Sequence, residues 1–175
     1  MRRSIDLRVV GLMCCAAVLG GCSGVSPLSA PVASYGASNI LSPSGYSQTK
    51  IDDTHFKVTA TGTEATPRER VEKIARARAA QIGVEEKLPY FKVAGVQHGV
   101  KCTKRQPGYK SEDTPASSRP TVELDVVYAK DAADPTFASS TAAFDALNAE
   151  LAGEVVAPEA KAAATQETRA GCGQG

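Results

Sequence analysis

The sequence contains no tryptophan, and aromatic residues make up only 5% of its 175 residues. A chain this poor in large rings has to build its core from aliphatic side chains, so we expect a small core in one domain. An excess of charge of one sign is also missing, because 20 Lys and Arg residues balance 19 Asp and Glu residues. Binding to nucleic acid requires a basic surface, so we expect no nucleic-acid partner.

Residues typical of catalysis and metal binding are scarce. The two histidines are His55 and His98, and no nucleophile elbow, zinc-protease, phosphate-binding-loop or Cys-x-x-Cys motif occurs. His98 and Cys102 have the spacing of helical metal ligands, but the surrounding pattern indicates a strand end and a loop, so we expect no metal site. We expect His55 on the solvent face of a strand. We therefore predict a protein that is not an enzyme and uses no cofactor or metal.

A long hydrophobic run is missing as well. The apolar run over residues 9–21 is shorter than the roughly 20 residues that span a bilayer, and it follows residues 1–8, where three arginines outweigh one aspartate. A positive start followed by a short apolar run is typical of a secretory signal peptide. The run ends in Leu-Gly-Gly-Cys, which resembles the lipobox of bacterial lipoproteins. We predict a signal peptide over residues 1–21, cleaved between Gly21 and Cys22.

The resemblance to bacterial lipoproteins implies that the Cys22 sulfur carries a diacylglyceryl group. Anchoring by several acyl chains is strong, because each buried CH₂ contributes about 0.8 kcal/mol. Ser23 follows in place of Asp, which favours the outer membrane in the enterobacterial sorting rule. We therefore expect a membrane-anchored envelope protein that faces the periplasm. The alternative is an ordinary signal peptide in which Cys22 is incidental; Cys14 and Cys15 are interpreted as small apolar members of the run.

Composition divides the rest of the chain. Residues 22–45 contain the predicted lipidated cysteine and a Ser-, Ala-, Pro- and Gly-rich stretch without periodicity, which indicates a flexible tether. We expect residues 46–152 to form a small domain. The Ala-rich tail over residues 153–175 is expected to be disordered.

Apolar periodicity predicts the elements of the domain. Alternation favours strands over residues 52–62, 90–100 and 121–130, and apolar residues at helical spacing favour a helix over residues 66–83 and a short helix over residues 141–152. In the last strand we expect four side chains to point inward, and these are Val122, Leu124, Val126 and Tyr128. In the second strand we expect Phe91 and Val93 on one face and Val96 near the other.

The helix over residues 66–83 has recognisable ends. Thr66 and Glu69 fit a capping box at its start, and Gly83 is expected to end it. Arg70 lies mostly off the apolar stripe. Arg78 lies close to the stripe, so we expect its stem to cover the edge of the core while its head reaches solvent.

These elements predict an α+β fold. We expect a small, mostly antiparallel sheet of about three strands, in the chain order strand, helix, strand, strand, with the capped helix packed on one face. A folded domain of this size needs a covalent cross-link or a binding partner to be stable. Two cysteines remain after cleavage and lipidation, and an even number in an oxidising compartment favours a disulfide between Cys102 and Cys172. The alternative is that Cys172 stays unpaired or bridges to another molecule.

One segment of the chain resembles a known family. It comprises Gly45-Tyr46-Ser47, the strand HFKVTATG, the helix with Arg76-Ala77-Arg78-Ala79-Ala80, and Pro89-Tyr90-Phe91-Lys92-Val93. It is similar to a segment shared by a family of uncharacterised envelope lipoproteins of proteobacteria, and the similarity covers residues 45–96. The chain departs from that family in having Arg78 where alanine is usual, and in its Ala-rich C-terminus. The resemblance implies a lipid-anchored α/β domain of no assigned activity and carries over no catalytic residue.

Two hypotheses of function follow. The first is a lipid-anchored envelope lipoprotein whose non-catalytic domain binds a protein or cell-wall partner. The alternative is a periplasmic redox or envelope-stress sensor that uses Cys102 and Cys172.

Overall fold

The computed structural model describes residues 31–103, 117–131 and 134–173. The predicted signal peptide, its cleavage site at Gly21 and the lipid acceptor Cys22 lie outside these residues. The described part has an α+β fold with a five-stranded antiparallel sheet and three helices, which confirms the predicted class. Within it, no helix combines the length and apolar character needed to cross a membrane.

The sheet places the fourth strand of the chain at its centre. Its spatial order is β1-β2-β4-β3-β5, and every neighbouring pair is antiparallel. The elements in chain order are β1 (Gly45–Lys50), β2 (His55–Thr61), α1 (Arg68–Glu85), β3 (Tyr90–Thr103), β4 (Ser117–Ala129), β5 (Ala138–Ser139), α2 (Ser140–Gly153) and α3 (Pro158–Gly171).

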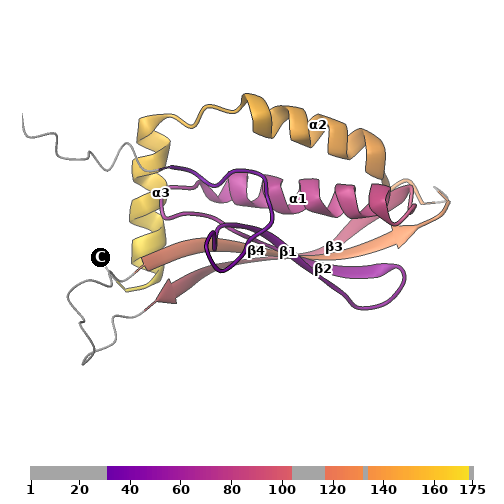
Figure 1. The fold of residues 1–175 in the computed structure, drawn as a ribbon, viewed down its shortest axis with the longest axis horizontal. Coiled ribbons are helices and arrows are strands. Elements are labelled where there is room, and N and C mark those ends of the chain that lie inside the picture. The colour runs from indigo at the N-terminus through magenta and orange to yellow at the C-terminus, as the bar shows by residue number, and fades with distance from the viewer. Residues whose placement is uncertain (1–30, 104–116, 132–133, 174–175) are drawn as a thin grey trace, which may run out of the picture.

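The helices all lie on one side of the sheet or at its end (Figure 1). Helix α1 packs on the sheet, mainly against β4 and β2, and α2 packs on α1 from the side away from the sheet. Helix α3 stands across one end of the sheet, next to β4 (Figure 1). No helix of the described part covers the opposite face of the sheet.

The core lies between α1 and the sheet. Strand β4 alternates as predicted, with Val122, Leu124, Val126 and Tyr128 all buried against α1. Strand β2 adds its own alternate residues Phe56, Val58 and Ala60, and α1 contributes Val71, Ile74, Ile82 and several alanines. Alanine lets the helix approach the sheet closely, which suits a chain poor in large side chains. The Tyr128 hydroxyl donates to the backbone oxygen of Ala79 at 2.6 Å, and burial raises the pKa of this phenol.

The prediction of about three strands is too low, because two edge strands lack the expected pattern. Strand β1 carries almost no apolar alternation, since only Tyr46 among its side chains packs against the core. Strand β5 has two residues and pairs only with the first two residues of β3. The predicted place of Val96 is also wrong. A β-bulge between Val93 and Gly95 shifts the register and turns Val96 to the same face as Leu124.

The described parts of the predicted tether and of the predicted tail are more ordered than expected. The Ala-rich tail forms α3, with proline in its first turn, and buries Ala164 and Thr168. In the predicted tether, residues 31–38 pack on the domain. Ala33 there is only 1% exposed, and the Tyr35 ring lies 5.0 Å from the Tyr46 ring. Only a few side chains of each segment pack on the domain, so neither segment shows an apolar period.

Helix α1 departs from the prediction at both ends. It begins at Arg68 after Pro67, and no side-chain capping bond forms, so the capping box of Thr66 and Glu69 is wrong. Gly83 does not end it, because α1 continues to Glu85.

Two arginines of α1 are buried, contrary to the prediction. Arg78 is only 7% exposed, because its guanidinium bonds to both oxygens of Glu85 at 2.9 Å and lies 5.0 Å above the Tyr46 ring. Arg70, 6% exposed, donates from Nε to the backbone oxygen of Ala33 and from a second nitrogen to Glu154. Both arginines therefore fasten other segments to α1.

Gly83 lies in tight contact with Ser140 at the start of α2, and replacing it by alanine is expected to destabilise the fold. A Cβ at this position would collide with the Ser140 side chain and lie 2.8 Å from the backbone oxygen of Leu88. Overpacking of this kind costs about 1–3 kcal/mol, which outweighs the roughly 1 kcal/mol that alanine gains over glycine in a helix. Urea unfolding of the full chain measures the change. Gly153→Ala is the matched control, because nothing lies within 4 Å of its added Cβ; equal stability of the two variants would contradict the packing described.

Candidate binding groove

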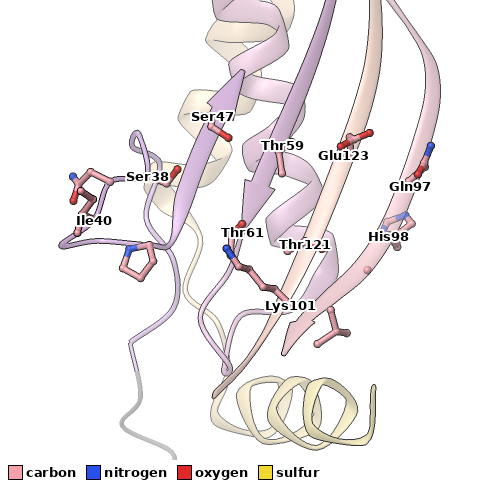
Figure 2. Close-up of a pocket in the computed structure, with 14 residues that line it drawn as sticks. Ser38, Ile40, Ser47, Thr59, Thr61, Gln97, His98, Lys101, Thr121 and Glu123 are labelled. Atoms are coloured by element: carbon pink, nitrogen blue, oxygen red, sulfur yellow. The ribbon is translucent and has the colours of Figure 1, made fainter. Parts of the chain in front are cut away.

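The uncovered face of the sheet carries a groove of about 790 Å³. Figure 2 shows it with α1 behind the strands, the turn over residues 38–43 on one side and β3 on the other. Most of its side chains carry hydroxyl, amide or charged groups. The lining residues are Ser38, Asn39, Ile40, Pro43, Ser47, Thr59, Thr61, Gln97, His98, Gly99, Val100, Lys101, Thr121 and Glu123.

The floor of the groove follows from the strand period. Alternate side chains of a strand point to opposite faces, so the residues between the core positions of β2 and β4 face the groove. Thr61 pairs directly with Thr121, and Thr59 pairs with Glu123. These four side chains are only partly exposed, and they form a compact patch of three hydroxyls and one carboxylate on a rigid sheet.

A turn next to β1 forms one wall. The Asn39 side-chain oxygen accepts from the backbone N–H groups of Leu41 and Ser42 at 2.9 and 2.7 Å, and the Asn39 N–H donates to the Ser42 oxygen. The Ser38 N–H donates to the Tyr46 oxygen, which ties the turn to β1. The turn presents Ile40, 99% exposed, at the rim of the groove.

The charges of the groove are only partly paired. Lys57 Nζ lies 2.9 Å from Glu123 Oε1, and this hydrogen bond raises the pKa of Lys57. His55 Nε2 lies 3.3 Å from Asp125 Oδ1 farther along the same face. Lys101 has no ion-pair partner among the described residues, and its side chain extends across β4 toward Thr61 (Figure 2). As far as the structure describes the chain, the Lys101 ammonium group is therefore available to a ligand with a carboxylate.

The structure separates the residues that the sequence singled out for chemistry. His55 lies on the solvent face of β2, as expected. His98 sits at the β3 side of the groove, but its Nε2 lies 3.5 Å from Glu72 Oε2 on α1. Cys102 is bonded to Cys172, so it has no free thiolate for a metal. The described residues contain no group of three His, Cys, Asp or Glu side chains that could hold a metal ion.

The disulfide joins the pair of cysteines that the sequence favoured. Cys102 and Cys172 are bonded with their Cα atoms 5.7 Å apart. Cys102 lies near the end of β3 and Cys172 directly follows α3. The bond therefore fastens the C-terminal helix to the sheet.

The strand predicted over residues 52–62 has Thr59 and Thr61 on the same face as His55, because alternate residues share a face, but this pattern gave no sign of a groove. The groove also needs the turn at Asn39 and residues of β3 that lie far away in the sequence, and no local pattern connects them. The apolar pair Ile40 and Leu41 within a stretch rich in Ser and Pro was the one available signal, and both side chains are exposed in the structure. Comparison with models of protein families, with curated proteins and with solved structures gives no match to this chain.

Proposed function

We propose that the chain is a lipid-anchored protein of the bacterial envelope, anchored at Cys22 and facing the periplasm from the outer membrane. Its domain binds an envelope partner, either a protein or a cell-wall component, and catalyses no reaction. The observation that carries this proposal is the broad groove on the uncovered face of the sheet, where most of the lining side chains carry polar groups. Such a groove can hold a large partner against a rigid surface, since its floor consists of side chains on two paired strands.

Two further features support the proposal. The disulfide between Cys102 and Cys172 fits an oxidising compartment such as the periplasm. Ala33, which is buried in the domain, lies eleven residues after Cys22, and an extended chain spans at most about 3.5 Å per residue. Anchoring at Cys22 would therefore hold the groove within a few tens of ångströms of the membrane.

Photo-crosslinking in intact envelopes tests the binding function. A photoreactive residue at Thr59 or Thr121 is expected to give adducts with an envelope component, because both positions lie in the groove. The matched control is Asn148, which is exposed on α2 and lies far from the groove. Absence of adducts from both groove positions, or the same adducts from Asn148, would contradict the proposal. The anchor is tested separately by Cys22→Ser, which is expected to lose the acyl mass and leave the membrane fraction.

A second function rests on the disulfide. Cys102 is exposed and Cys172 is partly exposed, so a reductant can reach the bond, and its reduction would release one end of α3. We propose redox or envelope-stress sensing as the alternative role. It requires a mobility shift on non-reducing gels in stressed cells and a response that disappears in Cys102→Ser. An unchanged response in that variant would exclude it.

A further inference from the structure

Strand β3, the longest of the sheet, has an outer edge that the described residues leave unpaired over most of its length. Strand β3 pairs with β4 along its full length, but with β5 only at Tyr90 and Phe91. From Val96 to Thr103, no strand of the described part pairs with its outer edge. A row of unpaired backbone groups of this kind is a template for another strand.

The ladder shows which backbone groups point outward. The Gly62 N–H donates to the Pro120 oxygen, and the Tyr128 N–H donates to the Thr54 oxygen. The backbone N–H and C=O groups of even-numbered β4 residues therefore point toward β2. Odd-numbered residues of β4 therefore bond toward β3, because bonding alternates along an antiparallel strand. Their partners in β3 are Gln97, Gly99 and Lys101. The intervening residues Val96, His98 and Val100 direct their N–H and C=O groups away from the sheet.

Cavities flank this edge on both faces of the sheet. On the uncovered face, residues 97–101 line the groove. On the helix face, a second pocket of about 420 Å³ has an apolar floor with Arg76 and Lys92 beside it. The residues that line the second pocket are Arg76, Phe91, Lys92, Val93, Val96, Thr136 and Ala138. A strand added to β3 would direct alternate side chains toward these two faces, which is the usual arrangement in recognition by strand addition.

Charge decides which strand fits the edge. Strand β3 contains Lys92, Lys101 and no aspartate or glutamate. Lys92 already has Asp134 as a neighbour, at 3.7 Å, whereas Lys101 has no such partner in the described part. A second copy of β3 would bring only like charges to this edge, and like charges across a ladder are destabilising. The edge therefore suits a strand that carries acidic side chains.

We propose that the partner in the groove is a polypeptide, which binds as an extended strand along the outer edge of β3. Its polar face carries an acidic residue that meets Lys101 in the groove, and an apolar side chain on its other face enters the pocket beside Val96. This proposal rests on the proposed binding function and names the class of partner. It requires no covalent step.

Selection from a displayed library of random short peptides, with the full chain as the target, tests the proposal. The enriched peptides are expected to alternate apolar residues with polar residues that include Asp or Glu. His98→Pro removes one outward N–H and leaves the bonds between β3 and β4 intact. His98→Thr is the matched control, since it also loses the imidazole but keeps the N–H. The proline variant is expected to bind the selected peptides about tenfold or more weakly than the threonine variant, because one edge bond is lost and the peptide is displaced near it.

A second measurement does not depend on the folding of the proline variant. Selected peptides N-methylated at every second residue are tested on the unchanged chain. One of the two registers is expected to lose binding by about tenfold or more and the other to retain it, because only alternate N–H groups face β3. Failure to enrich any peptide, equal effects of both methylation registers, or a dimer in sedimentation that His98→Pro dissolves would each overturn the proposal. Groove crosslinks to a cell-wall component alone would overturn it too, while leaving the proposed binding function intact.

Discussion

Replacing both Cys102 and Cys172 by serine is expected to lower the free energy of unfolding by up to about 4 kcal/mol, because the bond closes a long loop in the unfolded chain. The two cysteines are 70 residues apart in the sequence, and few other contacts hold the C-terminal helix in place. Helix α3 buries only Ala164 and Thr168. Without the disulfide, we expect α3 to open before the rest of the domain unfolds.

Two ion pairs hold α3 besides the disulfide. Arg68 lies 2.8 Å from Glu167, and Arg169 lies 2.9 Å from Glu64. The Arg169 hydrogen bond lowers the pKa of Glu64, so this pair stabilises the folded state above the ordinary carboxyl pKa and is lost as the pH falls through the lowered value. Opening of α3 in the cysteine-free variant should therefore increase in acid.

Urea unfolding and hydrogen exchange of the full chain, before and after reduction, measure this prediction. The reduced chain and the double serine variant are expected to behave alike, with exchange in α3 faster than in β4. A double variant as stable as the oxidised chain would show that the loop closure contributes nothing. If reduction leaves the hydrogen-exchange protection of α3 unchanged, the proposed redox-sensing role also loses its basis.

The central elements could be predicted because their patterns are local. Strand β4 alternates along its whole length, and α1 carries its apolar residues at helical spacing, so each pattern indicates both the element and the face it buries. The edge strand β1 could not be predicted in this way, since an edge strand with Tyr46 as its single core contact needs no alternation. The groove could not be predicted either, because it forms where three strands and a turn from distant parts of the chain meet.

The residues most often misread were polar residues near the core. Arg70 and Arg78 lie on α1 at positions where a solvent-exposed arginine is the common outcome, and both are buried because other segments pack on them: the Tyr46 ring of β1 covers Arg78, and a distant segment supplies an acceptor to Arg70. For Arg70 that acceptor is the backbone oxygen of Ala33, which belongs to a stretch with the composition of a linker. The packing of that stretch is visible only in the structure.

Thr66→Val is expected to destabilise the fold by about 3 kcal/mol, because it removes the acceptor of two backbone N–H groups while keeping the shape of the side chain. Thr66 is fully buried, and its hydroxyl oxygen accepts from the N–H groups of Ala33 and Thr63, both at 2.9 Å. Each N–H left without a partner in a dry site costs about 1–3 kcal/mol.

The control and the readout separate the lost hydrogen bonds from lost packing. Thr66→Ser keeps the hydroxyl and removes one methyl group, so it should cost only about 1 kcal/mol. Hydrogen exchange at Ala33 should rise sharply in the valine variant and little in the serine variant, since the Ala33 N–H loses its acceptor only in the first. Equal destabilisation by the two substitutions would mean that the methyl group, and not the hydroxyl, fixes residues 31–38 to the domain. The N-terminal segment would then be held by the bond from Arg70 to the Ala33 oxygen and by the packing of Tyr35 on Tyr46.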